Sequence, residues 1–254
     1  MPRPPEQPRY EYEWPFEPPS EAQVKRWLRG THYGFNAFMF VGGKKVTTSG
    51  TENRLPANEG RVDALTHHNS HDAPAAGEVE WRYSGRALHY VTKNTLLRGP
   101  LGFYLSRLGG FPADREEGRF LNDTVRYGAD IARAGGVVGS FEEGTRTNGW
   151  FVDDILGIAR LIARQAGVLI QPVAIVGDQD LSNKRPRAVH LHFWEPMEAN
   201  GSRKVVEPEI RARMQLAMNA GREEYQSRYG RQPGTGAIII RKPSKEVKKR
   251  SRRW

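Results

Sequence analysis

The sequence predicts one α/β domain, and two observations support that prediction. Short apolar runs suited to strands alternate along the chain with longer segments of helical periodicity, an order that is typical of α/β folds. The chain of 254 residues, with 37% hydrophobic and 27% charged residues, is also long enough to bury a sizeable core. Most of the chain is therefore expected to be globular.

The chain opens with two segments that are expected to lie outside this domain. Residues 1–19 carry seven of the 17 prolines and predict an extended, disordered arm. An amphipathic helical segment is expected over residues 20–41, because Ser20 and Gln23 can form a capping box. Side chains at helical spacing follow, namely Val24, Trp27, Leu28 and His32. Basic residues flank this stripe, so it fits a membrane interface as well as it fits packing on the domain.

Strand-like runs recur within residues 42–230, the range expected to form the domain. Apolar alternation or glycine turns mark most of them, and one continuous apolar run is typical of a strand covered on both faces. In chain order the expected strands are residues 44–48, 61–66, 87–92, 135–141, 168–176 and 188–194.

Helices are expected between these strands, because apolar residues repeat there at helical spacing. The expected helices are residues 96–108, 120–134, 150–166 and 207–229. In the first, one side carries Leu97, Leu101, Tyr104, Leu105 and Leu108. In the third, the side chains expected to be buried are Phe151, Ile155, Ile158, Ala159, Ile162 and Ala166. A basic tail over residues 231–254 follows and is either solvated or docked on an anionic surface.

Composition excludes several kinds of site. The chain has no cysteine, so disulfides, thiolate catalysis and cysteine-based zinc sites are absent. No window approaches the roughly 18 apolar residues of a spanning helix, and the N-terminus lacks a signal pattern, so export is not expected. The net charge of +10 favours anionic partners such as nucleic acid, an anionic membrane face or phosphorylated substrates.

Residues 66–72 form a histidine cluster with the sequence Thr-His-His-Asn-Ser-His-Asp. His67 and Asp72 cannot share a helical face, because a residue five places along lies about 140° around a helix. They can meet if Asn69 and Ser70 form a turn, which both residue types favour. Asp72 would then accept a hydrogen bond from His67, whose other ring nitrogen would take a proton from a substrate hydroxyl. The cluster therefore predicts a histidine base oriented by an aspartate.

Other interpretations of this cluster stay open. One is a metal-dependent hydrolase with the ligands His67, His68, His71 and Asp72, although their spacing matches no recognised ligand motif. Another is a structural or surface role. His68 is also a candidate base, since it fits the H-H-x-x-x-D-G signature of condensation and chloramphenicol-acetyltransferase-like enzymes, except that Ala73 replaces the glycine. A nucleic-acid-binding protein is suggested only by the basic charge, because no binding module is recognised.

Four blocks resemble, in order, motifs of the glycerolipid acyltransferase family, the 1-acylglycerol-3-phosphate acyltransferases and their relatives. Residues 66–72 resemble the N-H-x4-D block, and residues 109–115 resemble the block that runs from glycine to arginine. Residues 141–146, Phe-Glu-Glu-Gly-Thr-Arg, resemble F-P-E-G-T-R, and residues 171–175, Gln-Pro-Val-Ala-Ile, resemble V-P-V-A-I. The resemblance covers residues 44–195 and implies a single glycerol-phosphate-acyltransferase-like domain with a central mixed sheet flanked by helices.

The resemblance also implies roles for individual residues. His67 is the expected catalytic base and Asp72 orients it, so that the acceptor hydroxyl attacks an acyl thioester without an acyl-enzyme. Arg115 and Arg146 would hold the acceptor phosphate, because guanidinium groups match phosphate oxygens. The other expected substrate-binding residues are Lys93, Glu143, Gly144 and Thr145.

By the same resemblance, the acyl donor is acyl-CoA or acyl carrier protein, and the expected reaction converts lysophosphatidic acid to phosphatidic acid. Another lysophospholipid, glycerol phosphate or a non-glycerol acceptor is the alternative. No cofactor, metal or nucleic acid is expected. The enzyme is expected in the cytoplasm, peripherally associated with the anionic inner face of the membrane.

Two residues depart from the family pattern. Thr66 stands where Asn is usual, so a supporting hydrogen bond is expected to differ. Glu142 replaces the usual Pro and would oppose phosphate binding unless it points away or meets a cation. These departures leave open that the chain is a family member without catalytic activity. Glu143 is expected to shape the phosphate site, or else only to pair with Arg146 or tie down its loop.

Overall fold

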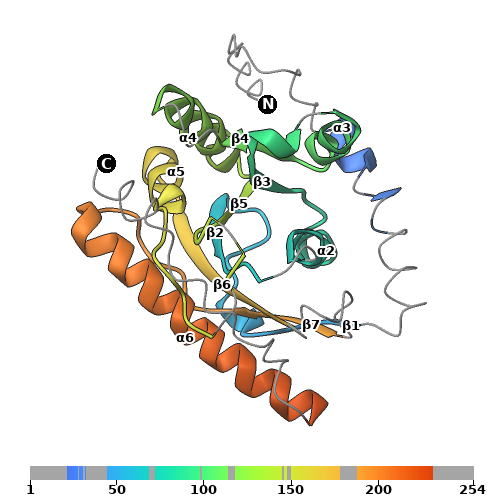
Figure 1. The fold of residues 1–254 in the computed structure, drawn as a ribbon, viewed down its shortest axis with the longest axis vertical. Helices are drawn as coiled ribbons and strands as arrows, with labels where there is room; N and C mark the ends of the chain where they lie inside the picture. Colours follow the sequence, from blue (N-terminus) through green and yellow to red (C-terminus); the bar gives the residue numbers. More distant parts are fainter. Residues whose placement is uncertain are drawn as a thin grey trace.

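The computed structural model contains a seven-stranded mixed sheet flanked by helices (Figure 1). It describes residues 22–27, 29–30, 32, 45–68, 72–97, 99–113, 118–144, 146–147, 150–177 and 188–230. The strands are β1 (Lys45–Ser49), β2 (Arg61–Leu65), β3 (Leu88–Lys93), β4 (Gly110–Ala113), β5 (Val137–Phe141), β6 (Leu169–Gly177) and β7 (Ala188–Phe193). The helices are α2 (Asp72–Ser84), α3 (Gly99–Arg107), α4 (Gly118–Arg133), α5 (Ile158–Ala166) and α6 (Arg203–Tyr229), with 3-10 turns η1 (Thr51–Asn53) and η2 (Asn94–Leu97). The predicted α/β fold with a mixed sheet is confirmed.

The strand order places the sequence motifs at one edge of the sheet. The order is β1-β7-β6-β2-β5-β3-β4. Strands β2 to β6 are mutually parallel, whereas β7 is antiparallel to β6 and pairs in parallel with β1. Parallel strands end at the same edge, which is where open α/β sheets bind their ligands. At this edge β2 leads to His67, β5 leads to Glu143, and β3 ends at Lys93.

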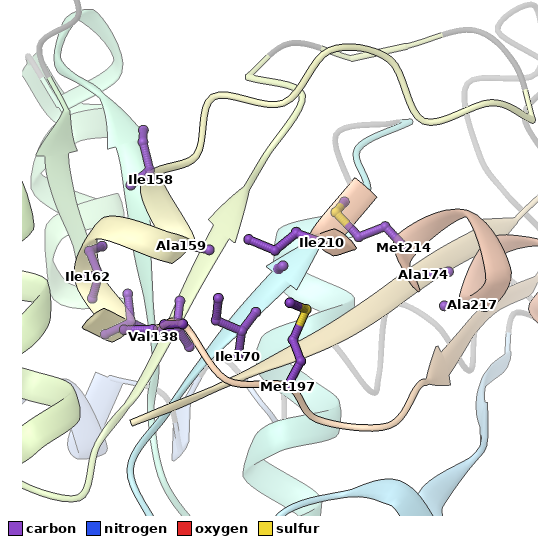
Figure 2. Packing of buried hydrophobic residues seen from close by; sticks show 14 of the residues in the cluster. Val138, Ile158, Ala159, Ile162, Ile170, Ala174, Met197, Ile210, Met214 and Ala217 are labelled. Carbon is purple, nitrogen blue, oxygen red and sulfur yellow. The ribbon is translucent and has the colours of Figure 1, made fainter. Parts of the chain in front are cut away.

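Helices cover both faces of the sheet and enclose two apolar cores. Helices α4, α5 and α6 pack on one face, and α2 packs on the other (Figure 1). Figure 2 shows part of the larger core, where Val138 and Ile170 of the sheet lie among residues such as Ile162 of α5 and Ile210 of α6. The smaller core joins alanines of α2 to Leu65 of β2 and to alternate residues of β6 and β7. Val62 and Ala64 of β2 belong to the larger core, because successive side chains of a strand point to opposite faces.

The sequence does not predict α2 or the short strand β4. In α2, Glu78 and Glu80 are buried and interrupt the apolar spacing of the helix. Arginines compensate both charges: Glu80 accepts hydrogen bonds from Arg54, at 2.6 Å, and from Arg61, and Glu78 accepts one from Arg82. Buried, paired carboxylates look like exposed positions in a hydrophobic pattern, so the helical period is hidden.

The helix predicted over residues 150–166 is wrong in its first half, because α5 covers only the second half. The first half is not helical, and Phe151 is 77% exposed rather than buried. Contacts with α6 hold this segment: Gln215 donates to the carbonyl of Trp150 at 2.8 Å and accepts the N–H of Val152 at 2.9 Å. These long-range hydrogen bonds leave no signal in the local apolar spacing.

Two further helix boundaries differ from the sequence pattern. Residues 96–108 divide into η2 and α3, with Gly99 in the left-handed region at φ +65°, and Tyr104 is exposed. Helix α6 begins at Arg203 rather than at residue 207. Proline is typical of a first helical turn, yet Pro208 lies inside α6.

The described part of the expected amphipathic segment, residues 22–27, 29–30 and 32, is helical. Val24 is buried and packs with Ala87. Nδ1 of His32 lies 2.7 Å from Oε2 of Glu78 in α2. This part of the segment therefore packs on the domain.

The proline-rich arm over residues 1–19 and the basic tail over residues 231–254 lie outside the described residues. Their expected disorder and surface docking stay predictions. Among the residues that the structure describes, no helix combines the length and apolar character that membrane crossing requires.

Candidate active site

His67 follows β2 and has a carboxylate partner. Its Nδ1 lies 3.0 Å from Oδ2 of Asp72, the first residue of α2. A carboxylate can only accept a hydrogen bond, so Nδ1 carries the hydrogen and Nε2 carries the lone pair. The side chain of His67 is 21% exposed and that of Asp72 is 1% exposed. The pair predicted from the spacing is formed, while its catalytic role stays a prediction.

Several contacts hold this pair in position. Asp72 lies at the N-terminus of α2, where the helix dipole favours a carboxylate. Its Oδ2 also accepts the backbone N–H of His68 at 2.6 Å. The ring of His67 lies against Phe141 with 4.4 Å between centroids, and Tyr90 stacks on Phe141. The sequence assigns no role to Phe141, although it opens the block at residues 141–146.

Glu143 fastens the turn after β5 to the strand end that carries His67. Its Oε2 accepts the backbone N–H of His67 at 3.1 Å. Its Oε1 accepts the hydroxyl of Thr147 at 3.0 Å and the backbone N–H of Asp153 at 3.2 Å. Burial raises the pKa of Glu143, and these donors oppose the rise in part. Among the roles left open for Glu143, these contacts favour tying down the loop.

Glu142 points away from the expected phosphate site. Its side chain is fully buried, and Oε1 accepts the hydroxyl of Ser140 at 2.6 Å and the N–H of Ala159 at 2.8 Å. Oε2 accepts the N–H of Gly157 at 2.9 Å. Both backbone donors belong to the N-terminus of α5, so Glu142 caps that helix from a neighbouring strand. Burial raises the pKa of Glu142, against the effect of the three donors.

Thr66, which stands where the family usually has Asn, hydrogen-bonds to β6; whether this differs from the usual Asn contact stays a prediction. Its Oγ1 accepts the N–H of Ile175 at 2.9 Å, and its own N–H donates to the carbonyl of Val173 at 3.2 Å. Both contacts join the end of β2 to β6. Thr66 therefore fixes the strand end immediately before His67.

The turn after β5 depends on a glycine. Gly144 has φ +66°, a left-handed conformation that favours glycine, and its N–H donates to the carbonyl of Phe141 at 2.9 Å. The neighbouring Thr145 lies outside the described residues. Gly144 thus shapes the turn that carries Glu143.

The structure describes two of the three cations expected to bind phosphate, Lys93 and Arg146, but not Arg115. Lys93 is exposed at the end of β3, and Arg146 is exposed after the turn that follows β5. Because β3 and β5 are neighbouring parallel strands, both cations belong to the sheet edge that carries His67. Arg115 lies outside the described residues, and its role stays a prediction.

The second histidine is not oriented by the aspartate. Asp72 contacts the ring of His67 but only the backbone of His68, whose Nδ1 lies 3.2 Å from the carbonyl oxygen of Thr147. This arrangement favours His67 as the base. His71 lies outside the described residues, and within the described part of the chain no three His, Asp or Glu side chains are grouped to hold a metal ion.

Comparisons with known proteins add two findings. A family model described as Acyltransferase matches residues 45–176, just over half of the 254 residues. Among solved structures, the crystal structure of the 1-acyl-sn-glycerophosphate (LPA) acyltransferase PlsC from Thermotoga maritima is similar, with a TM-score of 0.57 and 19% identity. That match covers 83% of this chain and 81% of that one, and it shows a shared fold. No curated protein matches the chain.

Proposed function

The chain belongs to the Acyltransferase family, and on that premise we propose that it transfers a fatty acyl group from an acyl thioester to the hydroxyl of a glycerol-phosphate-type acceptor. The preferred reaction is lysophosphatidic acid to phosphatidic acid, with acyl-CoA or acyl carrier protein as the donor. The observation that carries the proposal is the contact between His67 and Asp72, which leaves Nε2 of a partly exposed imidazole at the sheet edge. The name of the similar Thermotoga maritima enzyme supports the same choice of acceptor.

In the proposed reaction, Nε2 of His67 takes the proton of the acceptor hydroxyl while the hydroxyl oxygen attacks the thioester carbonyl carbon. A C–O bond forms, the C–S bond breaks, and the proton on Nε2 passes to the departing thiolate sulfur. The products are an ester and a free thiol. Asp72 stabilises the imidazolium that exists between the two proton transfers. The transfer is direct, so no nucleophilic side chain is required.

The acceptor phosphate is proposed to bind beside His67 at the same edge of the sheet. Lys93 and Arg146 are exposed there, and Arg115 is expected to join them. Guanidinium groups stay charged and match phosphate oxygens in pairs. Glu142 does not oppose this binding, because its carboxylate is turned toward α5. The charges at this edge therefore favour a phosphorylated acceptor.

A panel of acceptors tests this function. Thiol release from acyl-CoA is measured with lysophosphatidic acid, glycerol 3-phosphate, lysophosphatidylcholine and monoacylglycerol. Lysophosphatidic acid is expected to support the fastest release, and monoacylglycerol, which lacks the phosphate, the slowest. Equal rates with monoacylglycerol and lysophosphatidic acid would contradict a phosphate site.

Arg146→Ala is expected to raise KM for lysophosphatidic acid roughly tenfold with little change in kcat, because an exposed arginine–phosphate contact contributes binding rather than chemistry. Initial rates across acceptor concentrations provide the measurement. Arg164→Ala is the matched control, since Arg164 is an exposed arginine in the last turn of α5, far along that helix from the active edge. An unchanged KM in Arg146→Ala would remove this residue from the phosphate site.

We also propose that the enzyme works in the cytoplasm, bound peripherally to the inner face of the membrane. Support comes from an aromatic cluster formed by the N-terminal segment and α3. Phe103 is 50% exposed, and the ring of Trp27 lies 6.3 Å from the rings of Phe103 and Tyr104. The guanidinium of Arg107 lies 3.4 Å from the centroid of Phe103. Exposed aromatic rings beside a cation are suited to an anionic bilayer surface.

Phe103→Ser is expected to lower the affinity for anionic liposomes about tenfold, because insertion of the ring into the interface is lost. Flotation with vesicles of phosphatidylglycerol and phosphatidylethanolamine provides the measurement. Leu216→Ser is the control, because Leu216 is similarly exposed but lies on α6, which is at the opposite side of the molecule from α3 (Figure 1). Equal flotation of the wild type, Phe103→Ser and a chain lacking residues 1–41 and 241–254 would contradict membrane docking.

A further inference from the structure

His68 is a buried imidazole that the proposed reaction does not use. Its side chain follows the active strand end, and the residue is 2% exposed. Its backbone N–H is held by Asp72, and its ring lies near Trp150, with 6.5 Å between centroids. Since both its backbone and its ring are held by neighbours, this imidazole has a fixed orientation.

The hydrogen bonds of the ring define its tautomer. Nδ1 lies 3.2 Å from the carbonyl oxygen of Thr147 and 3.5 Å from the hydroxyl of the same residue. A carbonyl oxygen can only accept, and the hydroxyl has acceptors of its own in Glu143 and the carbonyl of His67. Nδ1 of His68 therefore carries the hydrogen. In the neutral ring, the lone pair lies on Nε2.

Nε2 of His68 is buried and has no hydrogen-bond partner among the described residues. Buried polar atoms are almost always paired in folded proteins, and an acceptor left unpaired costs stability. His68 is next to the proposed base His67 and holds this acceptor in a fixed orientation. Such an acceptor is preorganised for a ligand. The missing partner must be a hydrogen-bond donor, because Nε2 offers only a lone pair.

The chemistry of the two substrates identifies the donor, on the basis of the proposed function. The single hydroxyl of lysophosphatidic acid is consumed at His67, so this acceptor has no further donor near the reacting carbon. The acyl donor does have one, the amide N–H that lies nearest the sulfur in the phosphopantetheine arm. We propose that Nε2 of His68 accepts a hydrogen bond from this amide N–H. CoA and acyl carrier protein share the arm, so the contact serves either carrier.

Two variants separate this contact from the structural role of the ring. His68→Asn keeps a side-chain N–H near the position of Nδ1, and so keeps a donor for the Thr147 carbonyl, but it lacks an atom at Nε2. It is expected to raise KM for acyl-CoA roughly tenfold and to leave KM for lysophosphatidic acid unchanged. His68→Gln, whose side-chain oxygen can accept near the position of Nε2, is expected to restore part of the acyl-CoA affinity. Thermal melting of both variants is the check that they are folded.

A pair of thioesters tests the contact without relying on a variant. One is the acyl thioester of N-acetylcysteamine, which has the amide, and the other is the thioester of 2-mercaptoethyl acetate, in which an ester oxygen replaces the N–H. The wild type is expected to favour the amide roughly tenfold in kcat/KM, and His68→Asn is expected to treat the two alike.

The outcomes separate this inference from the proposed function. No transfer by the wild type from acyl-CoA to any acceptor would remove the proposed function itself. Transfer with equal kcat/KM for the two thioesters would overturn only the contact at His68. If neither small thioester reacts, the acyl-CoA measurement decides, and a His68→Asn variant with an unchanged KM for acyl-CoA, or with a raised KM for the acceptor instead, would overturn the contact.

Discussion

His67→Ala is expected to lower acyl transfer by at least roughly 10³-fold while the protein stays folded. The variant removes the nitrogen that takes the proton of the acceptor hydroxyl, and no other described ring is oriented by Asp72. The side chain of His67 is partly exposed and contributes little to either core, so the cost in stability is small. Product formation from acyl-CoA and lysophosphatidic acid measures the loss.

Circular dichroism and thermal melting of His67→Ala provide the necessary control. A folded variant with wild-type turnover would show that His67 is not the base. The same assay on His68→Asn separates the two histidines, because that variant is expected to keep kcat.

Glu142→Ala is expected to lower the free energy of unfolding by on the order of 3 kcal/mol, the largest stability effect anticipated here. The substitution leaves three buried donors without their acceptor, namely the hydroxyl of Ser140 and the N–H groups of Gly157 and Ala159. It also opens a cavity at the N-terminus of α5. Chemical denaturation measures the change, and the melting temperature is expected to fall by roughly 6–12 °C.

Two variants control the Glu142 experiment. Glu142→Gln keeps the volume and one acceptor oxygen, so its loss is expected to lie between those of the wild type and Glu142→Ala. Glu59→Ala removes an exposed carboxylate and is expected to change stability by less than about 0.5 kcal/mol. A Glu142→Ala protein as stable as Glu59→Ala would show that the carboxylate does not hold α5.

The sequence allowed the contact between His67 and Asp72 to be predicted, because both residues lie within residues 66–72 and their meeting depends on local spacing. The parallel strands then bring Lys93, Arg146 and this pair to one edge, which follows from the alternation of strands and helices. Local patterns and fold class together were therefore sufficient to bring these residues to one edge, while their roles stay predictions.

Features that depend on partners distant in sequence were not predictable. Helix α2 is hidden because Glu78 and Glu80 are buried, and their long-range partners are His32 for Glu78 and Arg54 and Arg61 for Glu80. Glu142 is adjacent to the phosphate motif in sequence, but its partners belong to α5. The non-helical course after Trp150 is likewise held by Gln215, over sixty residues away. In each case a long-range hydrogen bond reverses the interpretation that the local pattern favours.

The most direct test of the central claim is a double-variant cycle on His67 and Asp72, with phosphatidic acid formation as the readout. Asp72→Asn alone is expected to lower kcat by on the order of 10²–10⁴-fold, because the carboxylate is proposed to orient the His67 ring and to stabilise its protonated form. In the His67→Ala background, the same substitution is then expected to change the residual rate by less than about twofold. A cycle in which the two losses multiply, in folded proteins, would contradict a base that depends on this carboxylate.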